Sequence, residues 1–162
     1  MQYLNIFLQC GDNPPVGGDN LKLKEIMTQT VVKVHPQESV AVAARLLTHY
    51  NIGALPVCGN DGKLCGLLTD RDVVTRCMAA GRLPENTKVQ EIMTNRLVTA
   101  SPDMEVNAAA HLMGREQVRR LPVLEEGRLC GMVSLGDLAG REETSLDVAD
   151  AMESICANIS KK

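Results

Sequence analysis

An internal duplication covers most of this chain. Residues 22–57 align with residues 88–123 without a gap, at an offset of 66 positions. One residue is then lost in a polar stretch, and residues 64–74 align with residues 129–139 at an offset of 65. The identical pairs include Glu25/Glu91, Ile26/Ile92, Met27/Met93, Thr28/Thr94, Pro36/Pro102, Ala43/Ala109, Ala44/Ala110 and the triplets Leu55-Pro56-Val57 and Leu121-Pro122-Val123. Because a turn is where a folded repeat tolerates such a loss, two copies of one supersecondary unit fill the chain.

Each copy is predicted to begin with a strand and a helix. A short run rich in β-branched residues, 31–34 in the first copy and 97–99 in the second, ends near a proline, as an extended segment does. Apolar residues then recur at i, i+3, i+4 and i+7, which is typical of an amphipathic helix. They are Val40, Ala43, Ala44 and Leu47 in the first copy, and Val106, Ala109, Ala110 and Met113 in the second.

Two apolar runs separated by a turn follow each helix. They span 54–58 and 64–69 in the first copy, and 121–124 and 129–134 in the second. This pattern predicts an antiparallel hairpin, whose last strand leads directly into a second helix. The expected fold is therefore α/β (α+β mixed), with two β-α-β-β-α repeats related by pseudo-two-fold symmetry and small mixed sheets flanked by helices.

The predicted boundaries are an N-terminal leader or arm (1–21), the first repeat (22–80), a linker (81–87), the second repeat (88–140) and a C-terminal helix or tail (141–162). Thr144-x-x-Asp147 predicts a helix over 145–159. Its apolar stripe must be covered by the chain's own core or by a second subunit. The residues of the stripe are Leu146, Ala149, Met152, Cys156 and Ile159.

Composition excludes several classes of protein. Hydrophobic residues make up 44%, charged residues 23%, and the net charge is −3, as in a globular protein. With no basic excess and 2% aromatic residues, nucleic-acid binding is not expected. No run approaches the roughly 18 apolar residues that span a membrane, and the N-terminus does not resemble a secretion signal. The six cysteines form no CxxC pair, so we expect reduced, buried thiols and a cytoplasmic location.

Two short motifs lie where a strand gives way to a helix: Thr69-x-x-Asp72 and Ser134-x-x-Asp137. Free backbone N–H groups and the helix dipole favour an anion at such a junction. The hydroxyl can add a phosphate contact, and the carboxylate can accept from both hydroxyls of a ribose diol. The same spacing is also close to a capping box, worth about 1 kcal/mol. Each motif taken alone favours capping. Repeated at corresponding ends of two repeats, and together with the family resemblance described next, the two motifs favour ligand binding in at least one copy.

The Ile-Met-Thr opening, the proline before an alanine-rich helix, the Leu-Pro-Val strand and the closing Thr/Ser-x-x-Asp together resemble the CBS domain, named for cystathionine β-synthase. The resemblance occurs twice and covers residues 22–140 in total. The chain therefore resembles a stand-alone prokaryotic CBS pair, or Bateman module. It implies clefts that bind AMP, ADP, ATP or S-adenosylmethionine as a regulatory ligand. It further implies a homodimer, with helices such as residues 73–80 in the contact, and an unknown protein partner.

The resemblance also implies roles for further residues. A basic residue before Leu-Pro-Val meets the phosphate in nucleotide-binding members, which points to Arg120, with Arg119 behind it and Arg71 as a weaker candidate. A surface charge, or an ion pair with Glu116 or Glu125, is the alternative for these arginines. An apolar slot for adenine would come from Ile52, Val118, Val32 and Val98, although core packing explains these four equally well.

No catalytic or metal site is predicted, and no catalytic cofactor. His35, His49 and His111 lack the spacing of a metal site, and each of Asp72 and Asp137 has its own hydroxyl partner, which is unlike a catalytic dyad. The sequence thus predicts a non-catalytic sensor of an adenosine-containing ligand. The alternatives are a ligand-free scaffold for dimerisation or partner docking and a redox switch through Cys65 and Cys130.

Overall fold

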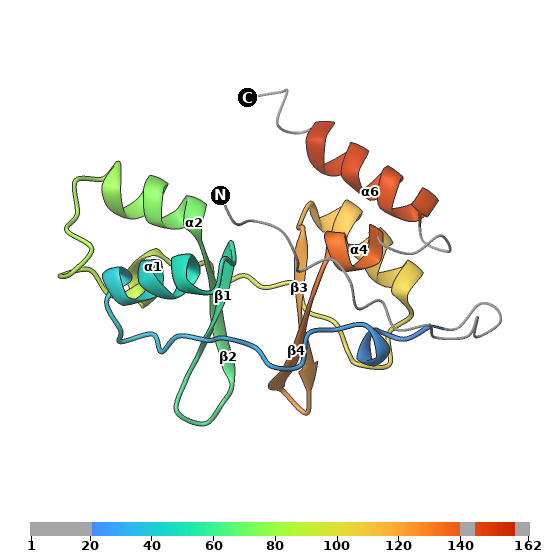
Figure 1. The fold of residues 1–162 in the computed structure, drawn as a ribbon, viewed down its shortest axis with the longest axis horizontal. Coiled ribbons are helices and arrows are strands. Elements are labelled where there is room, and N and C mark those ends of the chain that lie inside the picture. The colour runs from blue at the N-terminus through green and yellow to red at the C-terminus, as the bar shows by residue number, and fades with distance from the viewer. Residues whose placement is uncertain (1–20, 140–144, 158–162) are drawn as a thin grey trace, which may run out of the picture.

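The computed structural model describes residues 21–139 and 145–157. The predictions made for the N-terminal arm before residue 21, for Thr144 and for Ile159 lie outside these residues. Figure 1 shows two hairpins side by side, each with its own helices. The elements in chain order are η1 (Leu23–Glu25), α1 (Val40–His49), β1 (Ala54–Cys58), β2 (Leu64–Thr69), α2 (Asp70–Asp72), the π-helical turn η2 (Val73–Met78), α3 (Val89–Ile92), α4 (Val106–Glu116), β3 (Arg120–Glu125), β4 (Arg128–Ser134), α5 (Leu135–Ala139) and α6 (Ser145–Ala157).

The two hairpins show the duplication in their geometry. β1 pairs antiparallel with β2, and β3 with β4. Each ladder slips once at the same place, between Val57 and Cys58 in the first copy and between Val123 and Leu124 in the second. Their turns meet through a bridge between Lys63 and Arg128. The predicted mixed fold of small antiparallel sheets flanked by helices is thereby confirmed.

The opening strand of each copy is shorter than the sequence predicts. It is reduced to one parallel bridge, Val34 to Val57 in the first copy and Ala100 to Val123 in the second. Val34 donates its N–H to the carbonyl of Pro56 at 3.0 Å. The next bond of a parallel ladder would need the missing N–H of that same proline, so the pairing stops there.

The opening segment of each copy packs on the sheet of the other copy. Thr28 pairs antiparallel with Met132, and Thr94 with Leu67. A side chain on Gly131 would collide with Met27, and one on Gly66 would collide with Met93. The glycine on each of these strands leaves room for the methionine of the opening segment from the other copy. Each packed unit therefore combines the hairpin of one copy with the opening segment of the other.

Two apolar cores result. Leu23 of η1 lies in the core of α4, β3 and β4, whereas Val89 and Ile92 of α3 lie in the core of α1, β1 and β2. The predicted helical stripes are buried in both copies, except that Ala44 is half-exposed. No helix within the described ranges is long and apolar enough to cross a membrane.

α6 packs on α4 through a face that differs from the predicted one. Gly114 of α4 is so close that a Cβ there would lie 3.0 Å from the Cα of Ala151. This contact buries Val148, Ala151 and Ile155. The predicted apolar stripe therefore faces outward, with Leu146 81% and Met152 40% exposed, and Ala149 and Cys156 also exposed. The prediction for this face was wrong because small residues on both helices decide which sides approach.

Candidate functional site

Two candidate sites lie at corresponding strand ends. Site 1 consists of Thr69, the last residue of β2, and Asp72 in α2. Site 2 consists of Ser134, the last residue of β4, and Asp137 in α5. The backbone of Thr69 is extended, with φ −114° and ψ 161°, and the helix begins at the next residue. The chain thus turns from strand to helix at the hydroxyl residue, as the motif predicts.

Site 1 is a complete capping box. The carboxylate oxygen Oδ2 of Asp72 accepts from the backbone N–H of Thr69 at 2.9 Å and from its hydroxyl at 2.7 Å. In return the N–H of Asp72 donates to the Thr69 hydroxyl oxygen at 3.2 Å. Asp72 is 9% exposed. The capping interpretation is therefore realised in the structure, and it uses only one of the two carboxylate oxygens.

Site 2 repeats this geometry in a more open place. Oδ2 of Asp137 accepts from the N–H and the hydroxyl of Ser134, both at 2.7 Å. The N–H of Asp137 donates to the Ser134 hydroxyl oxygen at 3.3 Å. Asp137 is exposed. In both sites Oδ1 takes no part in the cap, so this oxygen is the one that can accept from a ligand hydroxyl.

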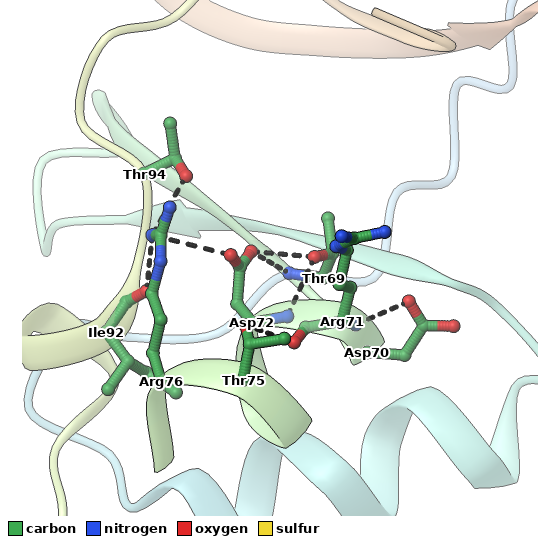
Figure 2. A network of polar contacts seen from close by, with 8 residues as sticks. All are labelled: Thr69, Asp70, Arg71, Asp72, Thr75, Arg76, Ile92 and Thr94. Atoms are coloured by element: carbon green, nitrogen blue, oxygen red, sulfur yellow. Dashed lines mark hydrogen bonds and ion pairs between the residues drawn. The ribbon is translucent and has the colours of Figure 1, made fainter. Parts of the chain in front are cut away.

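An arginine that the sequence analysis missed lies beside site 1. Nη1 of Arg76 is 3.4 Å from Oδ1 of Asp72, and it donates to the carbonyl of Ile92 at 2.9 Å and to the hydroxyl of Thr94 at 3.1 Å. Figure 2 shows the Asp72 carboxylate between Thr69 on one side and Arg76 on the other. The i,i+4 spacing of Asp72 and Arg76 is the signal that could have identified this pair.

Arg120 links the neighbourhoods of the two sites. Its backbone pairs with Ser134 across the β3–β4 ladder, whereas its guanidinium extends to the first copy. A Cβ on Gly53 would lie 3.1 Å from Nη2 of Arg120 and 3.5 Å from Oδ2 of Asp70. Because Gly53 has no side chain, the cation can lie against the start of β1, next to site 1.

The other predicted cations are more peripheral. The carbonyl of Arg119 accepts the N–H of Leu135 at 2.9 Å, and its side chain is exposed. Arg71 is exposed as well. Glu116, which the sequence offered as an ion-pair partner for the second-copy arginines, is 2.9 Å from Arg115 instead.

The four predicted adenine-slot residues occupy two matched pairs of positions. Val32 and Ile52 pack against the core of the first unit, and Val98 and Val118 against that of the second. All four are half-buried. Each side chain thus contributes to a core and keeps an exposed part, which fits both interpretations that the sequence left open.

The cysteines differ in accessibility. The five within the described ranges are free thiols. Cys58 and Cys77 are buried, Cys130 is half-buried, and Cys65 and Cys156 are exposed. The expectation of buried thiols is wrong for these last two, because Cys65 lies where the β1–β2 ladder slips and Cys156 lies on the outer side of α6. Burial raises the pKa of the Cys130 thiol, which disfavours the reactive thiolate.

Each of the three histidines has its own local contact. Nε2 of His111 lies 3.2 Å from Oδ1 of Asp147 on α6, and His49 makes an edge contact with Tyr50. Nδ1 of His35 accepts the N–H of Gln37 at 3.3 Å. Within residues 21–139 and 145–157, no group of three or more His, Cys, Asp or Glu side chains could hold a metal ion.

Comparison with known proteins agrees with this architecture. The family model for the CBS domain matches residues 23–79 and 89–143. The CBS domain-containing protein YhcV of Bacillus subtilis is 39% identical over 133 residues, which are 82% of this chain and 94% of that protein. Hypoxic response protein 1 of Mycobacterium tuberculosis is 34% identical over 83% of this chain and 93% of its own length. The chain therefore belongs to the CBS-domain family, as a tandem pair.

A solved structure of another CBS pair, with ligands bound to it, has a similar fold. The CBS domain pair of protein MJ0100, in complex with 5′-methylthioadenosine and S-adenosyl-L-methionine, is 28% identical to this chain. It matches with a TM-score of 0.69 over 75% of this chain and 95% of its own length. The fold that carries sites 1 and 2 is thus one that holds adenosine ligands in another protein.

Proposed function

We propose that this protein is a non-catalytic regulatory module that binds an adenosine-containing ligand between its CBS repeats and reports its occupancy to a partner protein. The observation that carries the proposal is the place of Arg120, whose backbone lies beside Ser134 and whose guanidinium lies beside Gly53 and Asp70. A phosphate held by this cation would lie beside Gly53 and Asp70, two residues before Asp72 of site 1.

The remaining candidates have complementary roles in this proposal. Oδ1 of Asp72 or Asp137 accepts from the ribose hydroxyls, and Thr69 or Ser134 holds each carboxylate in place. Arg119 and Arg71 add positive charge near the phosphate. The half-buried Val32, Ile52, Val98 and Val118 supply apolar contacts to adenine. Because Arg120 favours an anionic ligand, AMP, ADP and ATP are preferred to S-adenosylmethionine.

The signal would be a population shift. A ligand that touches both repeats stabilises one arrangement of them, and it shifts the equilibrium only by its differential affinity for the two arrangements.

The free thiols of the described cysteines support a reducing compartment such as the cytoplasm.

A thermal-melt panel with AMP, ADP, ATP, S-adenosylmethionine and GMP tests the proposal. A ligand at 100 times its Kd adds about 2.7 kcal/mol of stability. We expect Arg120→Met to weaken nucleotide binding about 10- to 100-fold, the value of a charge-assisted hydrogen bond. Arg115→Met, which removes an exposed cation of α4, is the matched control. Binding that is unchanged by Arg120→Met would contradict the proposed phosphate contact.

The complete capping boxes favour a second candidate, a scaffold that binds no ligand. Each box satisfies its own hydroxyl and one carboxylate oxygen without a ligand. For a scaffold, the whole panel stays flat at millimolar concentrations. Asp72→Ala and Asp137→Ala then cost only a modest amount of stability, whereas a sensor loses affinity while its fold survives.

Exposed apolar side chains on the outer helices support a homodimer in either case. Val74 and Met78 of η2 are 56% and 61% exposed, and Leu146 and Met152 of α6 are exposed as well. Sedimentation of Met78→Glu and Leu146→Glu against the unmodified protein tests this. Dissociation to monomers supports a helix-mediated dimer, and an unchanged mass contradicts it.

A further inference from the structure

Arg76 connects site 1 to the stretch of chain that leads into the second repeat. It lies on η2, one turn after Asp72, and its side chain is 48% exposed. The two hydrogen-bond acceptors of its side chain, the Ile92 carbonyl and the Thr94 hydroxyl, belong to that stretch. Figure 2 shows the guanidinium between Asp72 and these two residues. One side chain therefore contacts both a site carboxylate and the opening of the second copy.

The segment that Arg76 contacts is anchored to site 1's own strand. Thr94 and Leu67 exchange two backbone hydrogen bonds, at 2.9 and 3.0 Å. Six residues further along the chain, Ala100 bridges to β3 at the edge of the second sheet. Thr94 thus lies between its own hydrogen bonds to the first sheet and the Ala100 bridge to the second.

Two hydrogen bonds and one ion pair meet at a single nitrogen. Nη1 carries two hydrogens and donates to the Ile92 carbonyl at 2.9 Å and to the Thr94 hydroxyl at 3.1 Å, while Oδ1 of Asp72 lies 3.4 Å away as its ion-pair partner. Oδ2 of Asp72 already accepts from Thr69. The oxygen that remains for a ligand hydroxyl is thus the same Oδ1 that attracts the Arg76 guanidinium.

We propose that Arg76 is a positioning residue that couples site 1 to the opening segment of the second copy, Val89–Thr94. When a ligand hydroxyl donates to Oδ1 of Asp72, this oxygen attracts the Arg76 guanidinium less strongly. The guanidinium is then held more closely by Ile92 and Thr94, and the segment is held more firmly. The ligand part of this mechanism rests on the proposed function, whereas the coupling itself exists without a ligand.

Amide hydrogen exchange at Thr94 and Leu67 measures the coupling. Asp72→Asn keeps one oxygen for Thr69 and replaces the other with an amide group, which cannot accept from Arg76. We expect this change to slow exchange at both amides about two- to fivefold, the range of a partly exposed ion pair. In an Arg76→Gln background, Asp72→Asn should have no such effect. Arg76→Lys should restore part of it, because the ammonium can still donate to Asp72 and to one further acceptor.

Arg82→Gln is the matched control. Arg82 is 45% exposed and pairs with Glu91 of α3 at 3.2 Å, so it contacts the same segment without touching Asp72. Asp72→Asn should keep its full effect in this background. An equal response to Asp72→Asn with and without Arg76→Gln would overturn the proposal, because Arg76 would then only be structural.

A second variant keeps the test independent of the stability of Asp72→Asn. Thr94→Val removes one acceptor with little change of shape, so Nη1 should move toward Asp72. Exchange at the Asp72 amide should then slow in the protein with Arg76 and stay unchanged with Arg76→Gln. The same change in both backgrounds would contradict the coupling.

AMP separates this proposal from the proposed function. If AMP binds and slows exchange at Thr94 only when Arg76 is present, both are supported. If AMP binds and Asp72→Asn acts equally in both backgrounds, the coupling fails while the proposed function holds. If no adenosine ligand binds but the effect of Asp72→Asn depends on Arg76, the coupling stands and the proposed function fails.

Discussion

Sites 1 and 2 have the same motif and the same three hydrogen bonds, yet they differ in their surroundings. Asp72 is buried and has Arg76 beside its free oxygen. Asp137 is exposed. The residue that corresponds to Arg76 in the second copy is Arg141, outside the described residues. Duplication has thus preserved the cap, while the exposure of the carboxylate has changed.

The comparison indicates that the motif by itself specifies a helix start. In the proposed function, the contacts that would favour a ligand come from residues outside the motif. Arg120 comes from the other repeat, and Gly53 is the residue that leaves room for it. The asymmetry of the pair therefore follows from single positions around an unchanged cap.

The largest effects on stability should come from the glycines on which the opening segment of the other copy packs. We expect Gly66→Ala to cost about 3 kcal/mol and Gly131→Ala about 1 kcal/mol, within the range of overpacking. The reason is that a Cβ on Gly66 meets the main-chain oxygen of Thr94 at 3.2 Å, whereas the three atoms nearest to a Cβ on Gly131 all belong to the side chain of Met27. Urea unfolding measures both. Met27→Ala should relieve Gly131→Ala, and a cost that Met27→Ala leaves unchanged would contradict the observed packing.

The two caps should differ next. Thr69→Ala should cost about 2 kcal/mol and Ser134→Ala about 0.5 kcal/mol, the upper and lower ends of the range for a helix cap. The bonds of Thr69 are partly buried, whereas those of Ser134 are exposed to water, which can replace them. Equal losses in thermal unfolding would show that burial does not distinguish the sites.

Much of the fold could be predicted because local sequence specifies it. The aligned repeats gave the hairpins, the alanine stripes gave α1 and α4, and Thr/Ser-x-x-Asp gave the caps. These features depend on residues within a few positions of one another, where periodicity and turn chemistry act directly.

The rest depends on contacts between distant residues. Nothing near Met27 in sequence indicates that it packs on Gly131, and the face of α6 was mispredicted because the contact between Gly114 and Ala151 outweighs the longer apolar stripe. At the candidate site, the sequence indicated the cap residues and Arg120. It did not indicate that Arg120 extends to Gly53, or that Arg76 shares its nitrogen between two segments.

We expect Gly53→Ala to change the stability less than the preceding variants do and to weaken the binding of AMP. The added methyl group would lie 3.1 Å from Nη2 of Arg120, so the guanidinium must move by a few tenths of an ångström. Stability should stay within about 0.5 kcal/mol, while the affinity for AMP falls. Gly136→Ala is the control, since its Cβ would lie 3.6 Å from the Ser134 hydroxyl, an ordinary contact. Equal affinities for both variants would argue against Arg120 as a ligand contact.

The smallest effect concerns the exposed contacts that hold η1 on the second unit. Hydrogen bonds from Lys24 and Lys22 hold the pKa of Asp103 below its usual value, and the same contact raises the pKa of Lys24. A carboxylate whose pKa is lowered in the folded protein stabilises the fold at pH values above its pKa in the unfolded chain, ~3.9. This stabilisation is lost as the pH falls through the folded pKa. Asp103→Asn should therefore lower the Tm slightly at pH 7, and this difference should shrink as the pH falls through the folded pKa.

Asp61→Asn is the control, because Asp61 pairs with Lys63 inside one hairpin. The change in Tm should depend on pH in the same way for both variants. Only Asp103→Asn should speed hydrogen exchange at Thr28, where the opening segment of the first copy pairs with β4. Faster exchange at Thr28 in both variants would mean that the Asp103 contacts do not specifically hold that segment.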